Sequence, residues 1–129
     1  MARIISSTVP SGFNSAPLDY IDTDTATAFA DGVFCVITNG KLAVAGATTT
    51  PTHITQGVKK AGETKRMPCA RVRGLKFTAK VNGAGALVRG DKVTLDAGAA
   101  GLTDTKTGGV AEIETAYTQK GVRMAVFTI

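Results

Sequence analysis

The pattern of apolar and polar residues along the chain predicts short β-strands joined by tight turns. The clearest case is residues 33–45, where two apolar runs flank the pair Asn39-Gly40. Asn-Gly accepts the positive φ angles of a two-residue type I′ turn, so this segment is predicted as a β-hairpin. Residues 48–52 (TTTPT) then interrupt the pattern, and Pro51 cannot donate a ladder hydrogen bond. A loop is expected after the hairpin.

Two further strands are predicted in the second half of the chain. Apolar and polar residues alternate over 75–81, which places Phe77 in the core and Lys76 and Lys80 in solvent. The chain ends on an apolar run, residues 122–129, which should be paired inside a sheet. The first segment is therefore predicted as a half-buried strand and the last as a paired strand.

Residues 90–119 give weaker signals. Gly90-Asp91 is typical of a turn and leads into a short strand over 92–96. Residues 110–119 fit a strand, although Val110, Ile113 and Tyr117 also form a helical stripe that Gly121 could cap. We favour the strand.

The first 30 residues follow neither a helical nor a strand period and carry turn-forming prolines. They are nevertheless too apolar for a pure linker. We therefore expect an N-terminal arm over 1–30 that lies extended on a neighbouring surface, followed by a β domain over 31–129. A disordered tail is the alternative. The apolar residues of the arm are Phe13, Leu18, Tyr20, Ile21 and Phe29.

Length and composition agree with one small all-β domain. A chain of 129 residues holds one core, and its 15 glycines favour turns and strands over helices. The fold class expected is a small β-barrel or sandwich of short antiparallel strands with the extended arm. Only 30 residues are Leu, Ile, Val or Phe and none is Trp, so the core is lean. Oligomerisation or docking on a larger surface would relieve that deficit.

Targeting signals are not evident. No apolar run approaches the roughly 18–20 residues that a membrane span requires. The N-terminus lacks the apolar core of a signal peptide. We expect a soluble, unsecreted product with no membrane partner.

The residues that most often carry metal or nucleophilic chemistry are sparse. Cys35 and Cys69 form no CxxC motif and have no nearby histidine, which argues against zinc. Two buried, reduced cysteines are favoured, and a disulfide between them stays open. The single histidine, His53, lies in a setting that matches no nucleophile motif, so a solvated or simply packed loop histidine is expected.

Other motif-like segments also fail on inspection. Gly85 and Gly90 have P-loop spacing, but Asp91 follows where the motif needs lysine. The aspartates after residue 21 lack the third ligand of an EF-hand, because Ala26 occupies its position. Glu112 lies near Glu114 without an apolar pocket to separate their pKa values. We predict no enzyme, no cofactor and no metal.

Charge is concentrated in the middle of the chain. Residues 59–92 contain ten basic and two acidic residues, in a protein of net charge +5. Such a surface attracts an acidic protein face or a nucleic acid, and a solvated face is the third possibility. Single-strand binders interleave basic and exposed aromatic residues, whereas this stretch offers only Phe77. An acidic protein partner is therefore favoured.

Residues 90–111 (GDKVTLDAGAAGLTDTKTGGVA) and 123–129 (RMAVFTI) carry a resemblance. They resemble the small β-barrel head decoration proteins of tailed bacteriophages, over roughly residues 31–129. That group shares a Gly-Asp-x-Val strand, a Gly/Thr-rich hairpin, a Gly-Val-Ala return and an apolar last strand. The basic stretch from Lys59 to Arg73 and the arm before Asp31 have no counterpart in that pattern.

The resemblance implies a structural virion protein that binds the outside of a capsid shell. Its partner would be the major capsid protein, and it would act as a homo-oligomer, with a trimer favoured. It would lie on the capsid surface, and in the host cytoplasm during assembly. A minor tail or head-fibre component, or a small basic β-barrel that binds single-stranded nucleic acid through Lys76 and Lys80, are the alternatives. The predicted partner-binding residues are Lys59, Lys60, Lys65, Arg66, Arg71, Arg73, Phe13, Leu18 and Tyr20.

Overall fold

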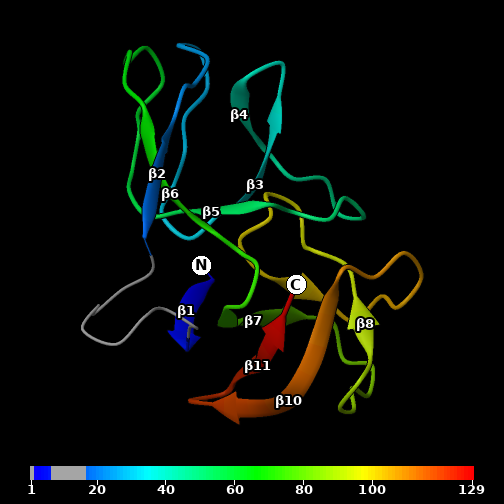
Figure 1. Ribbon diagram of the computed structural model, residues 1–129. Helices are drawn as coiled ribbons and strands as arrows, with labels where there is room; N and C mark the ends of the chain where they lie inside the picture. Colours follow the sequence, from blue (N-terminus) through cyan, green and yellow to red (C-terminus); the bar gives the residue numbers. More distant parts are fainter. Residues whose placement is uncertain (1, 7–16) are drawn as a thin grey trace.

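The chain folds into two β-sheets that form a small sandwich and are not closed into a barrel (Figure 1). The computed structural model describes residues 2–6 and 17–129. The described part contains strands and turns and no helix, so the predicted all-β class is confirmed. The strands are β1 (Arg3–Ser6), β2 (Leu18–Ile21), β3 (Phe34–Thr38), β4 (Lys41–Val44), β5 (His53–Thr55), β6 (Met67–Arg71), β7 (Lys76–Asn82), β8 (Lys92–Val93), β9 (Leu102–Thr103), β10 (Ala111–Gln119) and β11 (Val122–Thr128).

The first sheet has the order β1-β7-β11-β10-β8, with β9 parallel to the end of β7. Its other pairs are antiparallel, and Phe77 of β7 lies opposite Phe127 of β11. The predicted alternation in β7 is confirmed, because Phe77, Ala79 and Val81 are buried and Lys80 is exposed. All but the first residue of the predicted segment 110–119 form strand β10, which confirms our choice of a strand over a helix.

The second sheet has the order β2-β6-β5-β3-β4. The hairpin predicted over 33–45 is present as β3 and β4, with Asn39 and Gly40 at φ angles of 52° and 75°. Both angles belong to a type I′ turn, which matches the right-handed twist of the paired strands. The predicted loop follows the hairpin, but it is succeeded by two strands that the sequence pattern did not indicate, β5 and β6.

The two sheets pack through aromatic side chains. Phe34 of β3 lies 5.1 Å from Phe77 and 5.9 Å from Phe127, measured between ring centroids. All three rings are fully buried, and edge-on or tilted ring pairs of this kind are favourable beyond their buried area. In Figure 1 the β2–β6 pair and the β3–β4 hairpin project away from the first sheet. Parts of the second sheet thus extend beyond the region where the sheets overlap.

The described parts of the predicted arm are built into both sheets. β1 pairs with β7 at the edge of the first sheet, and β2 pairs with β6 at the edge of the second. Phe29 is buried in the core, at 3% exposed. These residues therefore contact this chain's own sheets, while Phe13 lies outside the described residues. The division into an arm over 1–30 and a separate domain over 31–129 stays a prediction.

The segment that follows β2 covers the outer edge of β4. The backbone N–H of Leu42 donates to the carbonyl of Asp22 at 2.8 Å, and Thr23 forms a parallel bridge to Leu42. Pairing at this edge satisfies backbone groups that an exposed strand would leave open. No helix in the described residues is long and apolar enough to cross a membrane.

Candidate docking surfaces

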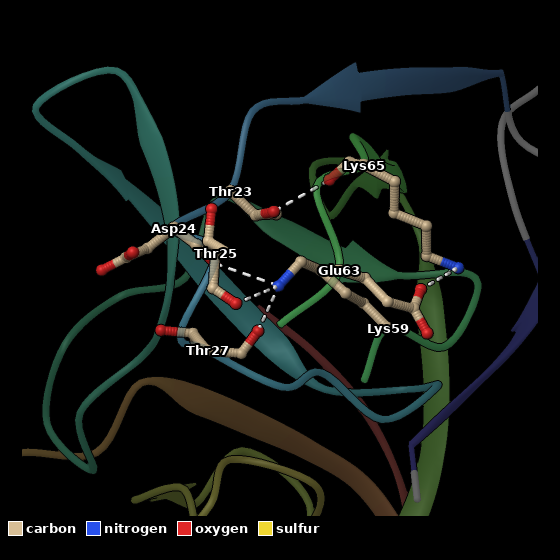
Figure 2. Close-up of polar contacts among 7 residues, drawn as sticks. All are labelled: Thr23, Asp24, Thr25, Thr27, Lys59, Glu63 and Lys65. Atoms are coloured by element: carbon tan, nitrogen blue, oxygen red, sulfur yellow. Dashed lines mark hydrogen bonds and ion pairs between the residues drawn. The ribbon is translucent and has the colours of Figure 1, made fainter. Parts of the chain in front are cut away.

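Lys59, which the sequence placed on a docking surface, is buried at 1% exposure. Its ammonium group donates hydrogen bonds to the backbone carbonyls of Asp24, Thr25 and Thr27 at 3.0, 3.3 and 2.6 Å (Figure 2). An ammonium has three N–H donors, so all of them find acceptors. The prediction that Lys59 contacts a partner is therefore wrong, because its charge is used inside the protein.

Backbone pairing explains why Lys59 reaches this loop. The N–H of Phe29 donates to the carbonyl of Lys59, and the N–H of Lys59 donates to the carbonyl of Phe29, both at 2.9 Å. The two segments are thereby fixed side by side. Nearby, the Thr23 hydroxyl donates to the carbonyl of Lys65 at 2.8 Å, as Figure 2 shows. Residues 22–29 are thus tied to residues 59–65 at several points.

Acidic residues of β2 and its neighbours pair with several of the predicted basic residues. Arg66 bonds Asp22 at 2.9 Å, and Arg71 bonds Asp19 at the same distance. These pairs reduce the positive field that the linear sequence suggested, although exposed ion pairs add little stability. Lys65 similarly lies 3.6 Å from Glu63. Lys60 and Arg73 have no acidic partner among the described residues.

Asp19, Arg71 and His53 form a polar cluster on β2, β6 and β5. The hydrogen bond from Arg71 is the main cause that holds the pKa of Asp19 below its ordinary value. His53 Nε2 lies 3.4 Å from the same carboxylate oxygen, Oδ2, and Nδ1 lies 2.8 Å from the hydroxyl of Thr52. His53 is 6% exposed, which agrees with the expected packed histidine, but it belongs to strand β5 and not to a loop.

An open groove lies beside this cluster. Its volume is about 670 Å³, and it combines apolar side chains with two arginines. β3 provides one wall, the segment 51–53 another, and residues 71–73 the third. The lining residues are Val36, Ile37, Pro51, Thr52, His53, Arg71, Val72 and Arg73. The structure thus brings together Arg71 and Arg73, two of the predicted binding residues, at a groove that the sequence did not reveal.

A second surface continues the core face of the second sheet to its edge. Directly paired residues across β3, β5, β6 and β2 are Phe34, Ile54, Ala70 and Leu18, whose side chains share one face. The first three are fully buried, whereas Leu18 is 43% exposed. Tyr20, two residues further along β2, is 62% exposed. We call Leu18 and Tyr20 the β2 patch; here the core face reaches solvent.

The outer face of the first sheet carries a different mixture. Lys76 pairs with Glu114 at 3.0 Å, while Lys80 is exposed. Tyr117 is 38% exposed, and its hydroxyl lies 2.9 Å from that of Thr78 on the same face. Sequence reasoning missed Tyr117 as a partner for the lysines because it belongs to β10, far along the chain.

The cysteines and the glycine-rich segments are explained by packing. Cys35 and Cys69 are buried and free, and burial raises the pKa of Cys35 to about 12 and that of Cys69 to about 11. Such thiols are poor nucleophiles at neutral pH. The Asp104 carboxylate accepts the N–H of Gly85 at 2.7 Å, in space that a Cβ would fill.

The described residues contain no cluster of His, Cys, Asp and Glu that could hold a metal ion. Comparison of the whole chain with protein-family models, with curated proteins and with solved structures finds no match. Evidence on function therefore comes from the surfaces themselves.

Proposed function

We propose that this chain is a structural virion protein that binds the outer surface of a capsid and stabilises contacts between coat subunits. The observation that carries the proposal is the β2 patch. Here the face of the second sheet that is buried in the core continues to the edge strand β2, where Leu18 and Tyr20 are exposed. Exposed apolar residues that continue a core face are typical of surfaces that another protein covers. The resemblance of residues 90–111 and 123–129 to head decoration proteins supports this choice of partner.

The mode of binding follows from the size of these surfaces. The β2 patch is small, so one copy would bind a coat subunit weakly. Several copies joined in a homo-oligomer, with a trimer favoured, would add their contacts through multivalency. The proposed location is the capsid surface, reached from the host cytoplasm during assembly. A minor tail or head-fibre protein is a close variant with the same binding chemistry.

One observation favours a second function, the binding of single-stranded nucleic acid. Tyr117 and Lys80 lie on the outer face of the first sheet, where an exposed aromatic ring could stack on a base. Against this function, Glu114 forms an ion pair with Lys76 and neutralises the charge of one of the two lysines on this face. The docking function therefore takes precedence.

Co-sedimentation with undecorated capsids of the encoding phage tests the proposal. The wild-type chain should pellet with the capsids. A Leu18→Ser/Tyr20→Ser variant should bind at least about tenfold more weakly, because burying two such side chains is worth several kcal/mol. The matched control is Val88→Ser/Val122→Ser, which removes exposed apolar residues elsewhere and should bind normally.

Two results would contradict the proposal. The first is a wild-type chain that stays in the supernatant with capsids at all concentrations. The second is a gel shift in which the wild-type chain binds a single-stranded oligonucleotide, and Tyr117→Ser abolishes that binding, while capsids are ignored. The second result would establish the nucleic-acid function instead.

A further inference from the structure

The groove beside His53 has walls that suit an apolar side chain. Val36 and Ile37 come from β3, Pro51 precedes β5, and Val72 follows β6. Ile37 is 45% exposed, so a ligand would cover apolar surface that now faces solvent. The volume of about 670 Å³ is in the range of peptide and small-molecule sites.

The polar groups at this groove are mainly hydrogen-bond donors. Arg71 donates from Nε to Asp19 at 2.9 Å, and its side chain is 77% exposed, so its guanidinium group is accessible to a ligand. Arg73 is exposed and has no acidic partner among the described residues. The Asp19 carboxylate is already engaged by Arg71. Guanidinium groups bind carboxylates in paired hydrogen bonds, so this edge favours an acidic ligand.

His53 and Asp19 support the arginine beside the groove. His53 Nε2 is buried and lies 3.4 Å from Asp19 Oδ2, the same oxygen that accepts from Arg71 Nε. The Asp19 carboxylate therefore faces both His53 and Arg71. Binding of an acidic ligand then depends on the exposed arginines and not on His53.

We propose that this groove binds an extended acidic segment of a partner protein, with an aliphatic side chain next to a carboxylate. The aliphatic group packs between Ile37 and Val72, and the carboxylate bonds Arg71 and Arg73. The proposal rests on the proposed function, in which the partner is a coat subunit. A nucleic acid fits less well, because none of the described residues that line the groove is Phe, Tyr or Trp, and the His53 ring is buried and offers little surface to a base.

A titration of the ¹⁵N-labelled full chain, followed by NMR, tests the groove directly. The probes are the peptide acetyl-LDLE-amide and its neutral counterpart acetyl-LNLQ-amide. The acidic peptide should shift the amide signals of residues 52–53 and 71–73, and bind at least about tenfold more tightly than the neutral one. Ile37→Ser should weaken the binding of both peptides, because both carry the aliphatic side chains that would pack on Ile37.

Charge reversal at the rim supplies the matched comparison. Arg73 lies in an exposed turn, and Arg73→Glu should weaken binding of the acidic peptide by about tenfold or more. Arg89→Glu changes an exposed arginine outside the groove by the same charge and should leave binding unchanged. Equal loss in both variants, shifts confined to another surface, or no saturable shift with the acidic peptide would overturn the proposal. Tighter binding of a single-stranded oligonucleotide at these signals would also overturn it.

Capsid binding separates this proposal from the function on which it rests. If wild-type chain binds capsids and Arg73→Glu binds them equally well, coat docking stands and the groove is not its site. If the wild-type chain does not bind capsids, the proposed function fails, and the peptide titration alone decides whether the groove binds acidic peptides. Loss of both peptide and capsid binding in Arg73→Glu, with Arg89→Glu normal, supports both.

Discussion

The ammonium group of Lys59 fixes the loop that leads from β2 toward β3. Its three acceptors are backbone carbonyls of residues 24, 25 and 27, so the hydrogen bonds do not depend on the side chains of that loop. A buried charge is tolerated only when such partners replace its lost hydration. The arrangement joins two segments that are more than 30 residues apart, and the connection that it fixes contains Phe29, a core residue.

Replacing Lys59 by Met should lower the free energy of unfolding by about 2 to 3 kcal/mol, because three carbonyls lose a charged donor while the apolar stem is kept. Urea unfolding measures the change, and the m-value should stay constant. Lys60→Met is the matched control: this neighbouring lysine is exposed, so its replacement should change stability by less than about 0.5 kcal/mol. Equal effects of the two variants would show that the Lys59 hydrogen bonds contribute nothing.

At the scale of elements, the hairpin turn at Asn39-Gly40 illustrates a signal that is entirely local. Gly40 has a φ of 75°, and a Cβ added there would meet no atom within 4 Å. Space is therefore available, and only the backbone conformation restricts the residue. The turn also sets the register in which Cys35 pairs with Val44.

Gly40→Val should destabilise the protein by about 1 to 2 kcal/mol, since a β-branched residue is strained at positive φ. Thermal unfolding gives the measurement. Lys41→Val places the same residue type at the adjacent strand position, where Lys41 is exposed, and should leave the melting temperature close to wild type. A Gly40→Val protein that melts with the control would show that this turn is not critical.

Local signals predicted several elements, and their absence explains those that were missed. The alternation of apolar and polar residues over 75–81 predicted β7, and the Asn39-Gly40 turn predicted β3 and β4. β5 has three residues, all buried, so it shows no alternation. β6 contains Pro68 and ends in Arg71, and its pairing with both β5 and β2 cannot be read from its own residues. The groove was missed for the same reason, because its walls come from three segments that meet only in the fold.

At the scale of the whole molecule, both sheets depend on residues before position 31. β1 supplies an edge of the first sheet, and β2 supplies an edge of the second together with Asp19 of the polar cluster. Phe29 and the carbonyl acceptors of Lys59 lie in the connection to β3. In a protein with so few large apolar residues, each such contribution is a large share of a small net stability.

Two deletions therefore should behave differently. Removal of residues 1–16 takes away β1, an edge strand that pairs with β7 alone, so the rest should fold with reduced stability and still bind capsids through the β2 patch. Removal of residues 1–30 also takes away β2, Phe29 and the acceptors of Lys59, and should abolish cooperative thermal unfolding and the dispersion of the amide NMR signals. If residues 31–129 instead unfold cooperatively and give a well-dispersed spectrum, the N-terminal strands are dispensable for folding. The division into an arm and an independent β domain, predicted from the sequence, would then be correct.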